Sequence, residues 1–176
     1  MEHFLTTPLY HDRVRLLKVG DEVRITGILY TARDAAHRRF YDAIKKGEPL
    51  PIDLEDQILY YTGPTPAPPG RVIGSAGPTT SSRMDDYTPL LLEKTGLLGM
   101  IGKGNRSHKV REAVLRFGAV YLAAIGGAGA LAAQCIKSSE IVAYEDLGTE
   151  AVRRIEVDNF PAVVALDSAG GCVFSC

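Results

Sequence analysis

Hydrophobic and polar positions alternate near the start of the chain and then change period. Residues 13–18 and 22–30 have the two-residue alternation that is typical of strands. Over residues 33–46 the apolar positions recur at helical spacing, and Gly47 follows as a stop signal. The pattern predicts a β-rich start followed by one helix.

Downstream, short apolar runs alternate with amphipathic stretches. The runs predict strands at residues 58–61, 72–75, 97–101, 119–125, 141–144, 152–157, 162–166 and 172–174. The amphipathic stretches predict helices at residues 89–95, 107–117 and 129–134. We therefore expect the α/β fold class, as a layered domain with mixed sheets.

A single composition shift interrupts this pattern. Residues 61–70 are rich in proline, which favours neither helix nor central strand and predicts an extended surface connection. The chain has 176 residues, of which 45% are hydrophobic, so it is long enough to bury one good core. We expect a single domain over residues 1–176.

Charge and cysteine content exclude several classes of protein. The 20 basic and 21 acidic side chains give a net charge of -1, which leaves no global field for nucleic acid or an anionic membrane. The longest apolar stretch, residues 119–133, is broken by glycines and is too short for a membrane span. Three cysteines are too few for a disulfide framework, and the charged N-terminus has no signal core. We expect a cytoplasmic protein whose charge-based function is local.

The segment over residues 71–86 carries the most chemical information. Gly74 and Gly77 lead into four consecutive hydroxyl residues beginning at Thr79, and Arg83 follows them. Glycines let backbone N–H groups approach a ligand, and an arginine can hold a carboxylate or phosphate through two hydrogen bonds. This is the outline of an anion site, although an ordinary Ser/Thr turn that caps the next helix explains the same residues equally well.

A second segment, residues 98–106, is an apolar run that ends in a lysine between two glycines. Lys103 is presented from a turn that lacks Cβ atoms on either side, which suits a point charge directed at a ligand. A phosphate-binding P-loop requires glycine where Leu97 stands and Ser or Thr where Gly104 stands, so that class is excluded.

A third glycine-rich segment matches a dinucleotide fingerprint only weakly. Gly127, Gly129 and Ala132 have the spacing of that fingerprint, and Glu145 and Asp146 lie at a suitable distance for a ribose contact. The motif comes too late in the chain for the usual strand order. Close packing of helix and strand is the favoured explanation of these glycines.

Other polar candidates have ordinary explanations when each is taken alone. Arg33 stands at a predicted helix N-terminus, which favours anions, but a surface pair with Asp34 explains it as well. His37 and His108 are single histidines on predicted helices, more typical of solvated or core-capping residues than of catalysts. Cys172 and Cys176 have no third ligand nearby, so we predict no metal site in this chain.

Five motifs together resemble a known family. They are TARDAAHRRF at 31–40, GPTTSSRMD at 77–85, GMIGKG at 99–104, AAIGGAGAL at 123–131 and IEVDNFPAVVALDSAG at 155–170. The chain resembles the β subunit, or C-terminal domain, of the class I iron–sulfur hydro-lyases, which are the fumarate hydratases and L-tartrate dehydratases. The resemblance covers nearly the whole chain. It implies a swivelling β/β/α domain.

The resemblance also implies roles for individual residues. Arg33, Arg83 and Lys103 match family residues that hold the substrate's carboxylates, and Thr79 matches a residue implicated in proton transfer. The family's [4Fe-4S] cluster is held by three cysteines of an α subunit or domain, and none of these ligands is in this chain. The resemblance therefore implies a hetero-oligomer with an α subunit, which is active only when both subunits are present. The implied reaction is the reversible hydration of fumarate to L-malate.

Elementary chemistry is consistent with that implication. A dicarboxylate needs a cation at each end, and a cation beside the reacting carbon stabilises the charge that builds up as a proton leaves. A threonine hydroxyl is too weak an acid to transfer protons without an activating neighbour. Two alternatives stay open: an L-tartrate dehydratase β subunit, and a non-catalytic module that binds a small anion or nucleotide.

Overall fold

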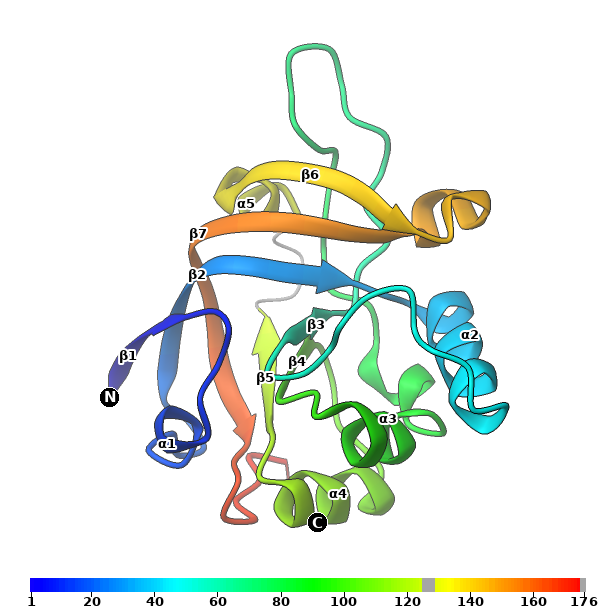
Figure 1. Ribbon diagram of the computed structural model, residues 1–176. Helices are drawn as coiled ribbons and strands as arrows, with labels where there is room; N and C mark the ends of the chain where they lie inside the picture. The colour runs from blue at the N-terminus through cyan, green and yellow to red at the C-terminus, as the bar shows by residue number, and fades with distance from the viewer. Residues whose placement is uncertain (125–128, 175–176) are drawn as a thin grey trace.

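A closed, mixed β-sheet forms the body of the molecule (Figure 1). The computed structural model describes residues 1–124 and 129–174, and in these the sheet has seven strands in the order β1-β2-β3-β4-β5-β7-β6. The strands are β1 (Glu2–Thr6), β2 (Glu22–Thr31), β3 (Ile58–Tyr60), β4 (Gly99–Gly102), β5 (Val120–Ala124), β6 (Ile136–Ala143) and β7 (Val152–Leu166).

Pairing between the two longest strands closes the sheet. β1 to β5 run parallel to one another, whereas β7 is antiparallel to β2, β5 and β6. Because β2 also pairs with β7, strands β2, β3, β4, β5 and β7 form a barrel-like ring, with β1 and β6 on its flanks. The predicted mixed α/β class is confirmed.

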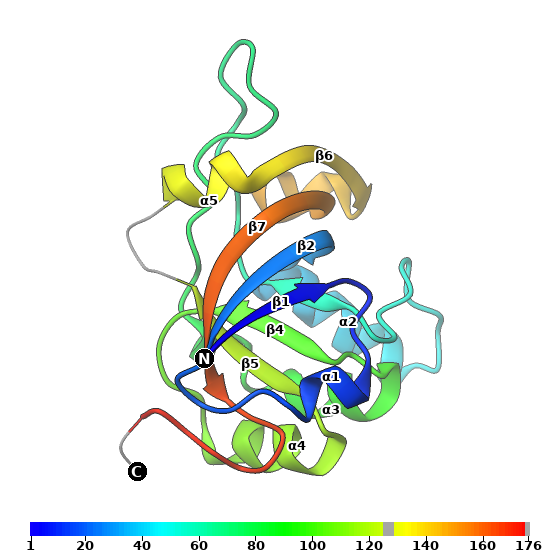
Figure 2. The same cartoon turned by 90° about the vertical axis from the view of Figure 1, so that its left-hand side faces the viewer.

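Both long strands bend at the same level (Figure 2). The register between β2 and β7 shifts between Ile25 and Gly27, where Gly27 has a φ of 128°. On β7, Asn159 has a φ of 53°, and its N–H donates to the Thr26 hydroxyl at 3.1 Å. A bulge of this kind lets one strand serve two parts of a curved sheet.

Alternation along the strands produces two cores. Ile58 and Tyr60 of β3 face the core inside the ring, whereas Leu59 and the adjoining Tyr61 face the core beneath the helices. β4 is buried along its whole length, as expected for a parallel strand that is covered on both faces.

Helices surround the ring (Figure 1). They are α1 (His11–Val14), α2 (Asp34–Lys45), α3 (Thr88–Thr95), α4 (His108–Phe117) and α5 (Gly129–Cys135), with 3₁₀ turns η1 (Ser81–Met84) and η2 (Glu145–Glu150). α2, α3 and α4 pack on the outer core of the ring, whereas α1 and α5 contribute residues to its inner core. Gly96 and Gly118 end α3 and α4 in the left-handed conformation, as their positions predict. No helix in the described ranges is long and apolar enough to span a membrane.

One predicted strand near the N-terminus is wrong. Residues 13–18 contain the end of α1 and a turn, because Val14 and Leu17 lie three positions apart and both enter the inner core. That spacing is typical of helical backbone. The apparent alternation comes from Val14 and Leu16, but Leu16 is exposed.

Other strand predictions are also corrected. Residues 72–75 form bends without a strand, and residues 172–174 contribute only an isolated bridge between Leu166 and Cys172. The strands predicted at 152–157 and 162–166 are one continuous β7, and β6 begins at Ile136, before the predicted residue 141. Part of the predicted 119–125 strand and Gly127 lie outside the described residues.

Candidate functional site

The two segments that carry Thr79 and Lys103 lie against each other. Lys103 follows the end of β4, and an isolated parallel bridge joins it to Thr80. The Lys103 N–H donates to the Thr79 carbonyl at 3.3 Å, and the Ser81 N–H donates to the Lys103 carbonyl at 2.9 Å. Residues far apart in the chain are thus fixed at one end of the sheet.

Glycine at position 102 permits this approach. A Cβ there would overlap the Ser81 hydroxyl and lie 2.9 Å from Cδ2 of Tyr61. Gly104, on the other side of Lys103, has a φ of 81°, which glycine adopts at little cost. The two glycines therefore serve different purposes: Gly102 leaves room for Ser81, and Gly104 allows the backbone of the turn.

Arg83 is held by an aspartate that the sequence analysis assigned to another arginine. Its Nε donates to Oδ2 of Asp34 at 2.9 Å, and its Nη2 lies 2.8 Å from the same oxygen, so the proposed pairing of Arg33 with Asp34 is wrong. Half of the Arg83 side chain is exposed, at 50%. Asp34 is the first residue of α2, so the pair ties η1 to that helix.

Arg33 immediately precedes α2 and packs over a glycine. Its Nη1 would be 2.6 Å from a Cβ at Gly63, so this guanidinium occupies space that a side chain would otherwise fill. Its Nε lies 4.0 Å from Oε1 of Glu150, which also accepts the Ala35 N–H at 3.3 Å. Arg33 is thereby directed by α2 and η2 together.

The resulting arrangement is open on one side. A hollow of about 500 Å³ is lined by Asp34, Arg83 and Glu150 with residues of α2 and Tyr87, but not by Thr79 or Lys103. Lys103 is exposed, and Thr79 is partly buried. The chain therefore places all four predicted residues on neighbouring loops without enclosing them in one pocket.

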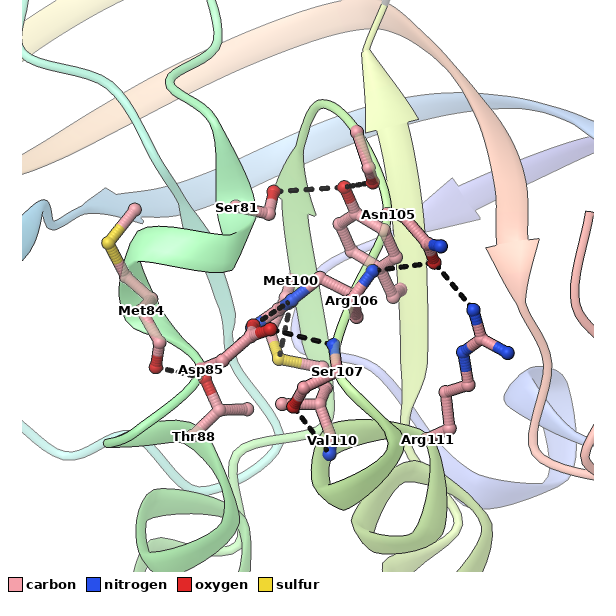
Figure 3. Close-up of polar contacts among 12 residues, drawn as sticks. Ser81, Met84, Asp85, Thr88, Met100, Asn105, Arg106, Ser107, Val110 and Arg111 are labelled. Carbon is pink, nitrogen blue, oxygen red and sulfur yellow. Dashed lines mark hydrogen bonds and ion pairs between the residues drawn. The ribbon is translucent and has the colours of Figure 1, made fainter. Parts of the chain in front are cut away.

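A buried arginine beneath these loops was missed by the sequence analysis (Figure 3). The Arg106 side chain is fully buried; its Nε donates to Asp85 Oδ1 at 2.7 Å and its Nη2 to the Thr88 hydroxyl at 2.9 Å. The guanidinium also lies 5.2 Å from the ring centre of Tyr61 and 4.8 Å from that of Tyr121.

The Asp85 carboxylate serves both segments at once. Its second oxygen accepts the Ser107 N–H at 2.7 Å, at the start of α4. Asp85 follows two residues after Arg83, and Arg106 follows three after Lys103. No local signal in the sequence marks this pair, because each residue alone resembles a solvated charge and the two meet only in the fold.

His37 is a fully buried core residue and is not solvated. Its Nδ1 lies 2.8 Å from the Arg33 carbonyl, and its ring packs edge-on against Tyr61. Burial lowers the pKa of His37 to about 4, with the Arg106 charge acting in the same direction and the Arg33 carbonyl opposing it. His108, by contrast, is exposed and lies 3.1 Å from Glu112.

The dinucleotide fingerprint gains no support. Asp146, one of the two ribose candidates, accepts a hydrogen bond from Arg39 at 2.9 Å. Gly129 packs against Gly77, whose N lies 3.2 Å from the position of a Gly129 Cβ, and its carbonyl accepts the Ala76 N–H at 3.2 Å. Close packing accounts for this described glycine of the motif. Among the described residues, no group of three metal-ligating side chains occurs.

The fold and the gathered loops define a class: an α/β domain that offers cations and a hydroxyl from loops at one end of a closed sheet. The chain belongs to the fumarase C-terminal family, because the family model described as "Fumarase C-terminus" matches residues 3–176.

Individual relatives agree with this family. The chain is 43% identical over 157 residues to "Fumarate hydratase class I, anaerobic" of Escherichia coli and to "Fumarate hydratase 1, mitochondrial" of Leishmania major, covering 89% of this chain and 29% of each relative. It is 40% identical over 166 residues to "Putative L(+)-tartrate dehydratase subunit beta" of Methanocaldococcus jannaschii, covering 92% of this chain and 85% of that relative. The chain thus spans under a third of the first two relatives.

Proposed function

We propose that this chain is the β-type part of an iron–sulfur hydro-lyase that reversibly hydrates fumarate to L-malate. The observation that carries the proposal is the meeting of the Thr79 and Lys103 segments, next to an Arg83 that is tied to the residue after Arg33. Membership of the fumarase C-terminal family supports it.

In this proposal the cations bind and orient the dicarboxylate. Asp34 lies at the Nε and Nη2 side of Arg83, which leaves the Nη1 N–H groups and the second Nη2 N–H for a substrate carboxylate. Arg33 and Lys103 hold the remaining carboxylate oxygens, and the three side chains fix the orientation of the reacting carbon–carbon bond. Positive charge beside the carboxylate stabilises the carbanion-like charge that develops when the C3 proton leaves.

Thr79 is the proposed proton-transfer group. Its hydroxyl alone is too weak an acid and base, so it needs a charged neighbour. The Lys103 N–H is hydrogen-bonded to the Thr79 carbonyl. We propose that the Lys103 ammonium stabilises a transient negative charge on the Thr79 hydroxyl.

The proposal assigns the [4Fe-4S] cluster to a partner α subunit. The described residues of this chain contain no grouping of ligands for it. When bound in the partner, such a cluster would supply a Lewis acid for the substrate hydroxyl. The cytoplasmic location stays a prediction.

A second candidate substrate is L-tartrate. It is favoured by one observation: the chain is 40% identical, over 92% of its length, to the relative named as a tartrate dehydratase subunit. The identity to the fumarate hydratases is similar, at 43% over 89% of the chain, so the comparisons fit either substrate.

The test is anaerobic reconstitution of this chain with an α-type partner from the same source, followed by assays with fumarate, L-malate and L-tartrate. We expect activity only in the reconstituted pair. Activity of the isolated chain would disprove the shared site, and a stable pair that is inactive on all three acids would favour the non-catalytic anion-binding module.

Substitutions test whether the proposed residues take part in the reaction. Arg83→Ala and Lys103→Ala should abolish turnover while leaving the fold and the pairing of subunits intact. Arg24→Ala is the matched control, because Arg24 is also a partly exposed arginine in one ion pair, with Glu2 at 3.2 Å on the flank of the sheet. Unchanged kinetics in the two site variants would remove these residues from the site.

A further inference from the structure

The hydroxyl of Tyr121 lies between the two loops of the candidate site. Tyr121 is a fully buried residue of β5. Its hydroxyl oxygen is 2.7 Å from the Gly104 carbonyl oxygen and 2.9 Å from Oγ of Ser81. One side chain therefore contacts the residue after Lys103 and a residue between Thr79 and Arg83.

The direction of these hydrogen bonds follows from the atoms. The Gly104 carbonyl can only accept, so the single phenolic proton of Tyr121 is donated to it. The Ser81 hydroxyl then donates to the Tyr121 oxygen. The result is an ordered chain from Ser81 through Tyr121 to Gly104.

The surroundings keep this chain intact over the working range of pH. Burial raises the pKa of Tyr121 to about 12, so the phenol keeps its proton in neutral solution. The Arg106 guanidinium lies 4.8 Å from the Tyr121 ring centre and is itself anchored by Asp85. The ring is thus held in position from below.

Packing contributes little to the place of the Lys103 turn itself. Lys103, Gly104 and Asn105 are exposed, and a Cβ at Gly104 would meet no atom within 4 Å. The backbone bond from Lys103 to Thr79 is long, at 3.3 Å. The Ser81 N–H holds the Lys103 carbonyl at 2.9 Å on one side of the turn. The Gly104 carbonyl, at 2.7 Å from the Tyr121 hydroxyl, is the point at which a buried side chain fixes the other side.

We propose that Tyr121 is a positioning residue, which acts through Gly104 and Ser81 to hold Lys103 in register with Thr79 and Arg83 for binding of the dicarboxylate. The inference rests on the proposed function and deepens it. Tyr121 does not contact the substrate; its hydroxyl sets where the Lys103 ammonium stands.

The experiment compares Tyr121→Phe with the parent chain and with Thr95→Val. The first variant removes only the hydroxyl. The control also removes a hydroxyl that is bonded to a carbonyl, that of Leu91 at 2.6 Å, but at the end of α3. The two variants should lose similar thermal stability. A difference between them in hydrogen exchange or in kcat/KM therefore reports the position of the Lys103 turn and not a loss of folding.

Two readouts are measured. In the isolated chain, hydrogen exchange of residues 102–105 should accelerate in Tyr121→Phe and stay at the parent rate in Thr95→Val. In the reconstituted pair, kcat/KM should fall about 10- to 100-fold in Tyr121→Phe, mainly through KM, because a displacement on the order of 1 Å costs that much. Adding Ser81→Ala should reduce kcat/KM by less than its effect in the parent, since both act through one chain of bonds.

The outcomes separate this inference from the proposed function. Parent-like exchange at residues 102–105 in Tyr121→Phe would overturn the positioning role, whether or not the pair is active. Parent-like kcat/KM, or an equal loss in Thr95→Val, would overturn it as well. A parent pair that is inactive on fumarate, malate and tartrate would refute the proposed function alone, and the exchange result would still decide whether Tyr121 fixes the turn.

Discussion

Acid should destabilise this chain through one histidine, and the structure gives the size of the effect. The His37 ring is fully buried, and its Nδ1 faces the Arg33 carbonyl at 2.8 Å. Because a carbonyl only accepts, Nδ1 carries the proton of the neutral ring. A second proton would go to Nε2, which is buried without a hydrogen-bond partner in the described structure.

The direction follows from the two pKa values. Burial lowers the pKa of His37 from 6.5 to about 4 in the folded chain. The unfolded chain therefore binds the proton first, so stability is complete above pH 6.5 and is lost as the pH falls toward 4. A shift of this size corresponds to at most about 3 kcal/mol, of which about 2 kcal/mol is lost by pH 5.

Urea unfolding at pH 7, 6 and 5 measures this loss. His37→Asn retains an amide that can donate to the Arg33 carbonyl but does not titrate. Between pH 7 and 5 its free energy of unfolding should therefore fall by about 2 kcal/mol less than that of the parent. His108→Asn is the control, because His108 is 83% exposed and should follow the parent profile. Parallel profiles for the parent and His37→Asn would refute the reasoning.

Two further predictions concern the framework beneath the site. Gly102→Ala should lower stability by about 1–3 kcal/mol in chemical unfolding, because its Cβ overlaps the Ser81 hydroxyl; addition of Ser81→Ala should recover part of the loss, and no recovery would contradict the steric cause. Arg106→Met should cost about 3–5 kcal/mol by leaving the Asp85 carboxylate without its buried partner. Arg83→Met, which breaks a pair at a half-exposed arginine, should cost less than about 1 kcal/mol; equal losses for the two arginines would contradict the role of burial.

Local signals made part of the fold predictable. The helix over Ser107 to Phe117 has its capping hydroxyl, its apolar face and its terminal glycine within one short segment, and the structure places α4 there with the Ser107 hydroxyl accepting the Val110 N–H. The two candidate site segments could be recognised for the same reason, since GPTTSSRMD and GKG are each a continuous stretch of sequence. The roles of their residues stay predictions.

Long-range partners were not predictable. Whether Asp34 binds Arg33 or Arg83 depends on α2 and η1 meeting in space, and nothing local to either arginine decides it. The buried pair of Arg106 and Asp85 is hidden for the same reason, because in sequence both residues resemble solvated charges. Closure of the sheet depends on β2 and β7, which lie at opposite ends of the chain.

The acidic partners change the electrostatic picture of the site. Arg33, Arg83 and Lys103 alone would form a strongly cationic patch, but Asp34 pairs with Arg83 and Glu150 lies 4.0 Å from Arg33. Two of the three cations are therefore offset within this chain, and the carboxylates serve to orient the guanidinium groups more than to neutralise a distant field. These three cations and two carboxylates sum to +1, so a bound dicarboxylate leaves them with one excess negative charge, and we expect further positive charge from a partner to tighten binding. We therefore expect the isolated chain to bind fumarate or malate weakly in calorimetry and the reconstituted pair to bind them much more tightly; equal affinities would show that this chain holds the dianion unaided.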